Sequence, residues 1–244
     1  MEKSVLLSVN PIWCEKISKV IFHTGDEKPV YEKSIEIRKT RPKIQTPFKV
    51  YIYCTKPKGE NDLGLCLDKG MNGNLKKVGL VYKRNYEAAN RMNMQILSGK
   101  IIGEFECDSI RKISYKKSDK GVWLKGIVGE FILSNSALSQ EELSSYLKSG
   151  SGYAWSISNL VIYDNPKNLY DFYKLGFATI EELEDELCNH CAATEYGEKS
   201  SYVTPNGYVS CEGRFCDEAY EAYLEDKFLL SRPPQSWCYV VPQV

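Results

Sequence analysis

The seven residues Lys33-Ser34-Ile35-Glu36-Ile37-Arg38-Lys39 alternate polar and apolar side chains. Successive side chains of a β-strand point to opposite faces, so this alternation predicts a strand with the two isoleucines on one face and the Ser, Glu and Arg side chains on the other. Glu36 stands two residues from Arg38 and is placed to hold its guanidinium in one orientation. We expect this polar face to be solvated and to form one wall of an anion-binding cleft. The alternative is a solvated strand with an ion pair that contributes little to stability.

Further cations flank the predicted strand. Lys33 precedes it, and Lys39, Arg41 and Lys43 follow it. Cations of this kind contact phosphates, so the candidate nucleic-acid-binding residues are Lys33, Glu36, Arg38, Lys39 and Arg41. If the protein is an enzyme, Lys33 is the candidate base and Glu36 the second catalytic candidate.

The same periodicity elsewhere predicts a mostly β core with helices, an α+β protein. The expected strands are Val5 to Val9, Ser34 to Lys39, Lys49 to Cys54, Lys100 to Cys107 and Tyr153 to Tyr163. Helical spacing predicts helices at Trp13 to Phe22, Leu138 to Lys148, from Thr179, and at Asp217 to Phe228. Ser139 and Glu142 form a capping box at the start of the second of these helices.

Length and composition restrict the class of protein. The chain has 244 residues, 43% of them apolar, which is enough for one large or two small cores and excludes a disordered chain. No apolar run approaches a membrane span or a secretory signal, so we expect a cytoplasmic protein without a membrane partner. Nine cysteines without an export signal indicate reduced thiols, some of which could hold metal.

Charge is divided unevenly along the chain. Residues 1–130 hold 25 Lys and Arg against 15 Asp and Glu, whereas residues 131–244 hold 7 against 17. Either one face attracts a polyanion or the two halves attract each other. The sequence leaves both alternatives open.

A cysteine cluster predicts a zinc site. Cys188 and Cys191 form one pair, and Cys211 and Cys216 form a second pair after a segment with a hairpin turn at Pro205-Asn206-Gly207. Four such thiols suit one tetrahedral structural zinc, which would stabilise an acidic insertion with few aliphatic residues. His190 could replace a cysteine, and four thiols without metal are the alternative. The remaining five cysteines are expected to be ordinary buried thiols.

Aromatic residues offer a second way to hold bases. Tyr51, Tyr53, Tyr82, Tyr86 and Trp155 could stack on unpaired bases. At strand spacing, such side chains more often fill a core.

Four short motifs resemble the ASCH family, a branch of the PUA-like β-barrels. Lys33 to Lys39 fits the end of its Gly-x-Lys-x-x-Glu-x-Arg motif, although Tyr31 occupies the Gly position. The other three, in the order of the family, are Leu7-Ser8-Val9-Asn10-Pro11, Lys100-Ile101-Ile102-Gly103-Glu104-Phe105-Glu106, and Ala154-Trp155-Ser156-Ile157-Ser158-Asn159-Leu160 with Tyr163-Asp164-Asn165-Pro166. The closing Arg232-Pro233-Pro234-Gln235-Ser236-Trp237-Cys238-Tyr239-Val240 is similar to the end of longer members found in phages and prophages.

The resemblance implies a PUA-like mixed β-barrel with flanking helices and a small zinc-stabilised helical insertion. The barrel would comprise residues 1–178, with a loop excursion at 56–98, and the insertion residues 179–227. Residues 228–244 would supply the closing strand.

The resemblance also implies that the protein binds RNA or another nucleic acid or nucleotide. The alternative is an RNA- or modified-nucleoside-processing enzyme, a ribonuclease or an amidohydrolase, in the same cleft. Glu36 occupies the position of a Thr nucleophile in the acetylcytidine amidohydrolases, so this sequence departs from that pattern. A host protein partner, bound through the acidic second half, is a third possibility.

Overall fold

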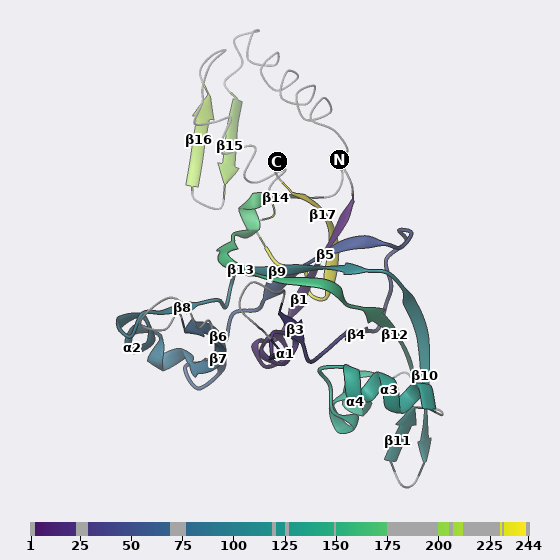
Figure 1. Ribbon diagram of the computed structural model, residues 1–244. Coiled ribbons are helices and arrows are strands. Elements are labelled where there is room, and N and C mark those ends of the chain that lie inside the picture. The colour runs from purple at the N-terminus through teal and green to yellow at the C-terminus, as the bar shows by residue number, and fades with distance from the viewer. Residues whose placement is uncertain are drawn as a thin grey trace.

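A six-stranded sheet curls into a half-barrel at the centre of this strand-rich α+β protein (Figure 1). The computed structural model describes residues 3–22, 29–68, 77–118, 121–124, 127–148, 150–174, 200–204, 207–211, 230 and 232–242. In spatial order the strands are β13 (Ser158–Lys167), β9 (Ile101–Cys107), β5 (Phe48–Cys54), β1 (Ser4–Val9), β17 (Trp237–Pro242) and β14 (Phe172–Lys174).

A four-stranded sheet carries the residues of the predicted cleft. Its order is β11 (Gly121–Leu124), β10 (Ile110–Ser118), β12 (Ser151–Ser156) and β4 (Ile35–Arg38). Helices α3 (Ile127–Asn135) and α4 (Gln140–Tyr146) lie beside it (Figure 1). Ile35, Ile37 and Ala154 pack there with Leu143 and Leu147 in one buried apolar cluster.

Smaller elements complete the described fold. Helix α1 (Pro11–Ile17) follows β1, and β2 (Val20–Phe22) pairs with β3 (Val30–Tyr31). The segment between β5 and β9 forms a three-stranded sheet, and β15 pairs with β16 in a hairpin. The bounds of these elements are β6 Leu63–Asp68, β7 Lys77–Tyr82, η1 Lys83–Asn85, α2 Tyr86–Arg91, β8 Met94–Ile96, η2 Leu169–Asp171, β15 Ser200–Thr204 and β16 Gly207–Cys211.

Strand β1 is central because both of its faces are covered. Val5, Leu7 and Val9 belong to the main apolar cluster, whereas Leu6 belongs to a second cluster with Tyr51 on the other face of the sheet. All six residues of the strand are buried, which explains why its sequence does not alternate as a half-exposed strand would.

The predicted closing strand joins the sheet of the first half. Strand β17 pairs antiparallel with β1, with Ser4 opposite Val240 and Leu7 opposite Trp237. This pairing confirms the expected contribution of the C-terminal segment. The capping box is confirmed as well, because the Ser139 side chain accepts from the Glu142 amide and Glu142 accepts from the Ser139 amide.

Three expected elements differ from the structure. The segment expected to be a loop excursion at 56–98 is largely folded, and Leu65, Leu67 and Leu97 are buried in the main core. The first expected helix ends at Ile17, since the β-forming sequence Val20 to Phe22 continues as a strand. The strand expected from Tyr153 to Tyr163 is two strands in two sheets, divided at Ile157.

None of the helices in the described part of the chain combines the length and hydropathy that crossing a bilayer requires.

Candidate functional site

Glu36 and Arg38 form a buried ion pair on β4. Nη2 of Arg38 lies 2.9 Å from Oε1 of Glu36, and the two side chains are 4% and 8% exposed, respectively. Nη1 of Arg38 donates to the carbonyl oxygen of Ser8 at 3.2 Å, which ties β4 to β1. The expectation that this polar face is solvated is therefore wrong. Both faces of β4 are buried, because the isoleucines pack under α3 and α4 while the charged pair faces the main core.

Two aromatic residues of β12 stand beside the pair. Trp155 is directly opposite Glu36, and Tyr153 is directly opposite Arg38. Directly opposed residues in an antiparallel pair share a face, so the charged pair and the two rings lie on the same side of the sheet. Trp155 is fully buried, whereas Tyr153 is only half-buried.

Three buried N–H groups of this cluster lack hydrogen-bond partners within the described chain. They are Nε and Nη2 of Arg38 and Nε1 of Trp155. Nη2 is within ion-pair distance of Glu36 but lacks the alignment of a hydrogen bond. Nε and Nη2 form one edge of the guanidinium, and the Glu36 carboxylate lies against the Nη2 end of that edge. Buried donors without acceptors are unfavourable, so the Nε–H is suited to one acceptor atom of a ligand or to ordered water.

Burial governs the charge state of the pair. Desolvation raises the pKa of Glu36, and the attraction of Arg38 opposes that rise only in part. Burial also raises the pKa of the Cys14 thiol far above the usual range, and the charges of Glu36 and Arg38 contribute less. An ionised Glu36 therefore depends on Arg38.

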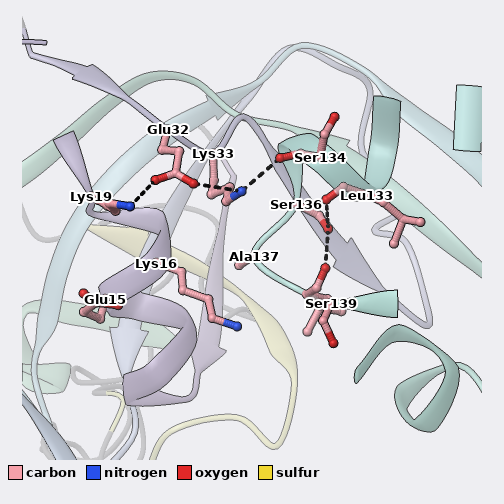
Figure 2. Close-up of a pocket in the computed structure, with 11 residues that line it drawn as sticks. Glu15, Lys16, Lys19, Glu32, Lys33, Leu133, Ser134, Ser136, Ala137 and Ser139 are labelled. Carbon is pink, nitrogen blue, oxygen red and sulfur yellow. Dashed lines mark hydrogen bonds and ion pairs between the residues drawn. The ribbon is translucent and has the colours of Figure 1, made fainter. Parts of the chain in front are cut away.

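Lys33 lies apart from the ion pair, in a pocket of about 440 Å³ (Figure 2). Its Nζ donates to the carbonyl oxygen of Ser134 at 2.9 Å and pairs with Glu32 at 3.1 Å. Glu32 also pairs with Lys19 at 2.7 Å. The pocket lies between α1, the β3–β4 connection and the α3–α4 connection, and its lining residues are Glu15, Lys16, Lys19, Glu32, Lys33, Leu133, Ser134, Ser136, Ala137, Leu138 and Ser139.

The wall of this pocket adjoins the core around the ion pair. Ala137 lines the pocket and also packs in the main apolar cluster that contains Trp155. Trp155 in turn faces Glu36. The pocket and the ion pair thus border the same apolar cluster.

Lys39 and Arg41 are exposed beyond the far end of β4. The Lys39 ammonium lies 5.0 Å from the centre of the Tyr146 ring, on the helix-covered side. The structure thus brings together Glu36 and Arg38, and it distributes Lys33 to one end of the strand and Lys39 and Arg41 to the other.

Most of the predicted stacking residues are structural. Tyr51, Tyr53 and Trp155 are at most 3% exposed and belong to the apolar clusters. Tyr86 is half-buried. Tyr82 is 42% exposed, but the Arg84 guanidinium lies over its ring at 4.8 Å.

The predicted zinc ligands are only partly within the structure. Cys188, Cys191, Cys216 and the alternative ligand His190 lie outside the described residues. Cys211 is the last residue of β16, and its side chain is likewise not described. The hairpin that precedes it is confirmed by the β15–β16 pairing. Among the residues that the structure does describe, no three His, Cys, Asp or Glu side chains gather in a way that could hold a metal ion.

The remaining cysteines are free thiols within the core or at its margin. Cys14, Cys54, Cys66 and Cys107 are buried and Cys238 is half-buried. Burial raises the pKa of Cys107 to about 11, despite hydrogen bonds to Ser156 and Ser109 that lower it. Four of the five thiols are therefore buried, as expected for ordinary core cysteines.

Sequence reasoning missed the pocket residues outside β4. Lys16 lies in α1 and Lys19 just after it, Ser134 lies in α3, and Ser136 and Ser139 lie in the α3–α4 connection. The Ser139–Glu142 capping box was one signal in the sequence that pointed to this region. In the structure, Glu142 also pairs with Lys16 at 3.1 Å, and this ion pair connects α4 to α1. That ion pair joins the basic and acidic halves of the chain.

Comparison with known proteins finds no family model, no curated protein and no solved structure that matches this chain. The functional argument therefore depends on the sequence and the structure.

Proposed function

We propose that this protein binds nucleic acid, RNA in preference to DNA, through the strand β4 and the cations at its two ends. The proposal rests on Arg38. Its guanidinium is 4% exposed and is held by Ser8 and Glu36, and its Nε has no hydrogen-bond partner in the described chain. This N–H is suited to one acceptor atom of a phosphate or of a base.

The cations at the ends of β4 supply the electrostatic part of the proposed binding. Lys33 is in the pocket at one end, and Lys39 and Arg41 are exposed at the other. Each cation that contacts a phosphate releases counterions, so the affinity should fall steeply as salt rises.

A PUA-like barrel of the ASCH type is part of the same proposal. Its supports are the curled six-stranded sheet, the closing strand β17 and the helices that flank β4. The order of the four sequence motifs along the chain agrees with it. A structural zinc in the Cys-rich segment, with ligands Cys188, Cys191, Cys211 and Cys216, also remains a proposal.

Binding of a labelled single-stranded RNA at several salt concentrations tests the proposal. We expect the logarithm of the association constant to fall linearly with the logarithm of the salt concentration. Lys33→Gln and Arg41→Gln should each weaken binding and lower the slope by about one. Lys83→Gln, on the β6–β7 side, is the matched control, because Lys83 is a partly exposed lysine paired with Glu60. An affinity that does not depend on salt, or that none of the variants changes, would contradict the proposal.

An enzyme that processes RNA or a modified nucleoside is the second candidate. The pocket favours it, because a cavity of about 440 Å³ with Lys33 and several serines has the size of a small-molecule site. In that case Lys33→Ala should abolish turnover of RNA or acetylated nucleoside while binding persists. If the wild-type protein binds RNA but does not turn it over, the enzyme candidate fails and only the binding function remains.

A further inference from the structure

An uncharged aromatic strand of the four-stranded sheet lies beside a basic strand. Strand β12 (Ser151–Ser156) has β10 on one side and β4 on the other. Residues 110–118, which contain β10, include Arg111, Lys112, Lys116 and Lys117 and no acidic residue. Residues 39–43, which follow β4, include Lys39, Arg41 and Lys43 and no acidic residue. Strand β12 contributes Tyr153 and Trp155 and no charge.

The strand register places a cation, a ring and a guanidinium in one row. Lys112 is directly opposite Tyr153 on β10, and Tyr153 is directly opposite Arg38 on β4. The three side chains therefore share one face. Lys112 is exposed, Tyr153 is half-buried and Arg38 is buried, so the row runs from the surface into the core.

Two further rings, both on β17, adjoin Trp155, which lies two residues from Tyr153 and so shares its face of β12. The ring centres of Trp155 and Trp237 are 6.3 Å apart, and those of Trp237 and Tyr239 are 5.3 Å apart, all with edge-to-face geometry. Trp237 and Tyr239 are half-buried. Rings at the margin of a core keep part of their surface available to a ligand.

The basic segment after β4 fixes these rings. Nε1 of Trp237 donates to Oγ1 of Thr40 at 2.8 Å, and the hydroxyl of Tyr239 accepts from the Lys43 amide at 2.5 Å. Arg41 and Pro42 lie between these two contacts in that segment, and both Arg41 and Lys43 are exposed. Cations and fixed rings thus occupy the same surface.

We infer that this surface, defined by Lys112, Tyr153, Trp237, Tyr239, Arg41 and Lys43, is the platform for a single-stranded polynucleotide. This inference rests on the proposed nucleic-acid function and names its substrate class. Single-stranded binders combine cations that follow the backbone with rings on which successive bases stack. A duplex keeps its bases inside and could use the cations alone, and an acidic peptide has no planar bases for the rings.

Binding of a labelled 12-nucleotide RNA, measured as a single strand and as a duplex, tests the inference. Tyr153→Leu should weaken single-strand binding roughly 5- to 150-fold, the range of one lost stacking contact, and should leave duplex binding unchanged. Tyr153→Phe keeps the ring and should bind as the wild type does, which separates stacking from loss of fold. Lys112→Gln should lower the salt slope by about one. Tyr82→Leu and Lys49→Gln are the controls, since both residues are exposed outside this surface.

The outcomes distinguish this inference from the function on which it rests. If the wild type binds no single-stranded RNA or DNA, both fail. If the wild type binds but Tyr153→Leu and Lys112→Gln bind equally well, the platform is wrong while binding at the Lys33 end of β4 stands. Equal affinity for single strand and duplex, or full competition by polyglutamate with no effect of Tyr153→Leu, would also overturn the platform.

Discussion

Replacing Arg38 by Ala should destabilise the fold strongly. The substitution leaves the Glu36 carboxylate buried without its counter-charge, and breaking a buried ion pair in this way costs about 3–5 kcal/mol. For a chain of this length, each kcal/mol corresponds to roughly 2–4 °C in Tm, so the expected decrease in Tm is roughly 6–20 °C. Lys16→Ala, which breaks the partly exposed pair with Glu142, should cost about 1 kcal/mol or less.

The loss of folding stability in Arg38→Ala should depend on pH, and the pKa of Glu36 determines the direction of that dependence. Burial already raises the pKa of Glu36 in the folded protein, and removal of Arg38 raises it further. A carboxyl whose folded pKa exceeds its unfolded pKa binds more protons when folded. Its contribution to stability is therefore most favourable below the unfolded pKa of about 4.3 and is lost as the pH rises through the folded pKa. Arg38→Ala should accordingly be less destabilising at pH 5 than at pH 7.5.

Urea unfolding of four proteins measures both effects. The wild type, Arg38→Ala, Glu36→Gln and the double variant are compared at pH 5 and at pH 7.5. Glu36→Gln removes the buried charge, so the double variant should be more stable than Arg38→Ala at pH 7.5 and should lose the extra pH dependence. If Arg38→Ala loses the same free energy at both pH values and Glu36→Gln recovers none of it, the buried carboxylate is not the cause and the reasoning is refuted.

Three further predictions concern other parts of the chain. Gly103→Ala should destabilise the fold by about 1–3 kcal/mol in thermal unfolding, because the new Cβ would lie 2.3 Å from the Val161 carbonyl oxygen, whereas Gly79→Ala, with nothing within 4 Å, should be tolerated. Ser139→Ala should cost about 1 kcal/mol through loss of the capping box, and an unchanged free energy of unfolding would show that this cap contributes nothing. Protein purified without chelator should contain about one zinc per chain by elemental analysis and should melt at a lower temperature in EDTA, and a metal-free chain with an unchanged Tm would remove the zinc.

The sequence was most informative where local pattern and burial agree. Strong alternation placed β4, β5 and β9, and the Ser139 capping box placed the start of α4, because these signals depend on nearest neighbours along the chain. The closing strand β17 was also predicted, but from the resemblance of residues 232–240 to the end of longer ASCH members rather than from a local pattern.

Other features depend on contacts that no local pattern encodes. A face that reads Ser-Glu-Arg looks solvated, yet Glu36 and Arg38 are buried because β12 and β1 bring Trp155 and a backbone carbonyl to them. The Lys56 to Ser98 segment looks like a loop because glycines interrupt it, yet its leucines pack into the main core. The pocket around Lys33 could not be read from sequence, since α1 and the α3–α4 connection meet there only in the fold.

The pairing of β1 with β17 has a consequence for how the chain folds. β1 is synthesised well before β17, so on a ribosome one edge of β1 lacks its neighbour while the segment between the two strands is made. That edge belongs to a strand that is mostly apolar and wholly buried in the finished fold, the kind that associates with other chains when it is left unpaired. Contacts this distant in sequence also slow folding. The half-barrel is therefore most exposed to misassembly before its last strand arrives, and a chain truncated before Trp237 should aggregate rather than fold.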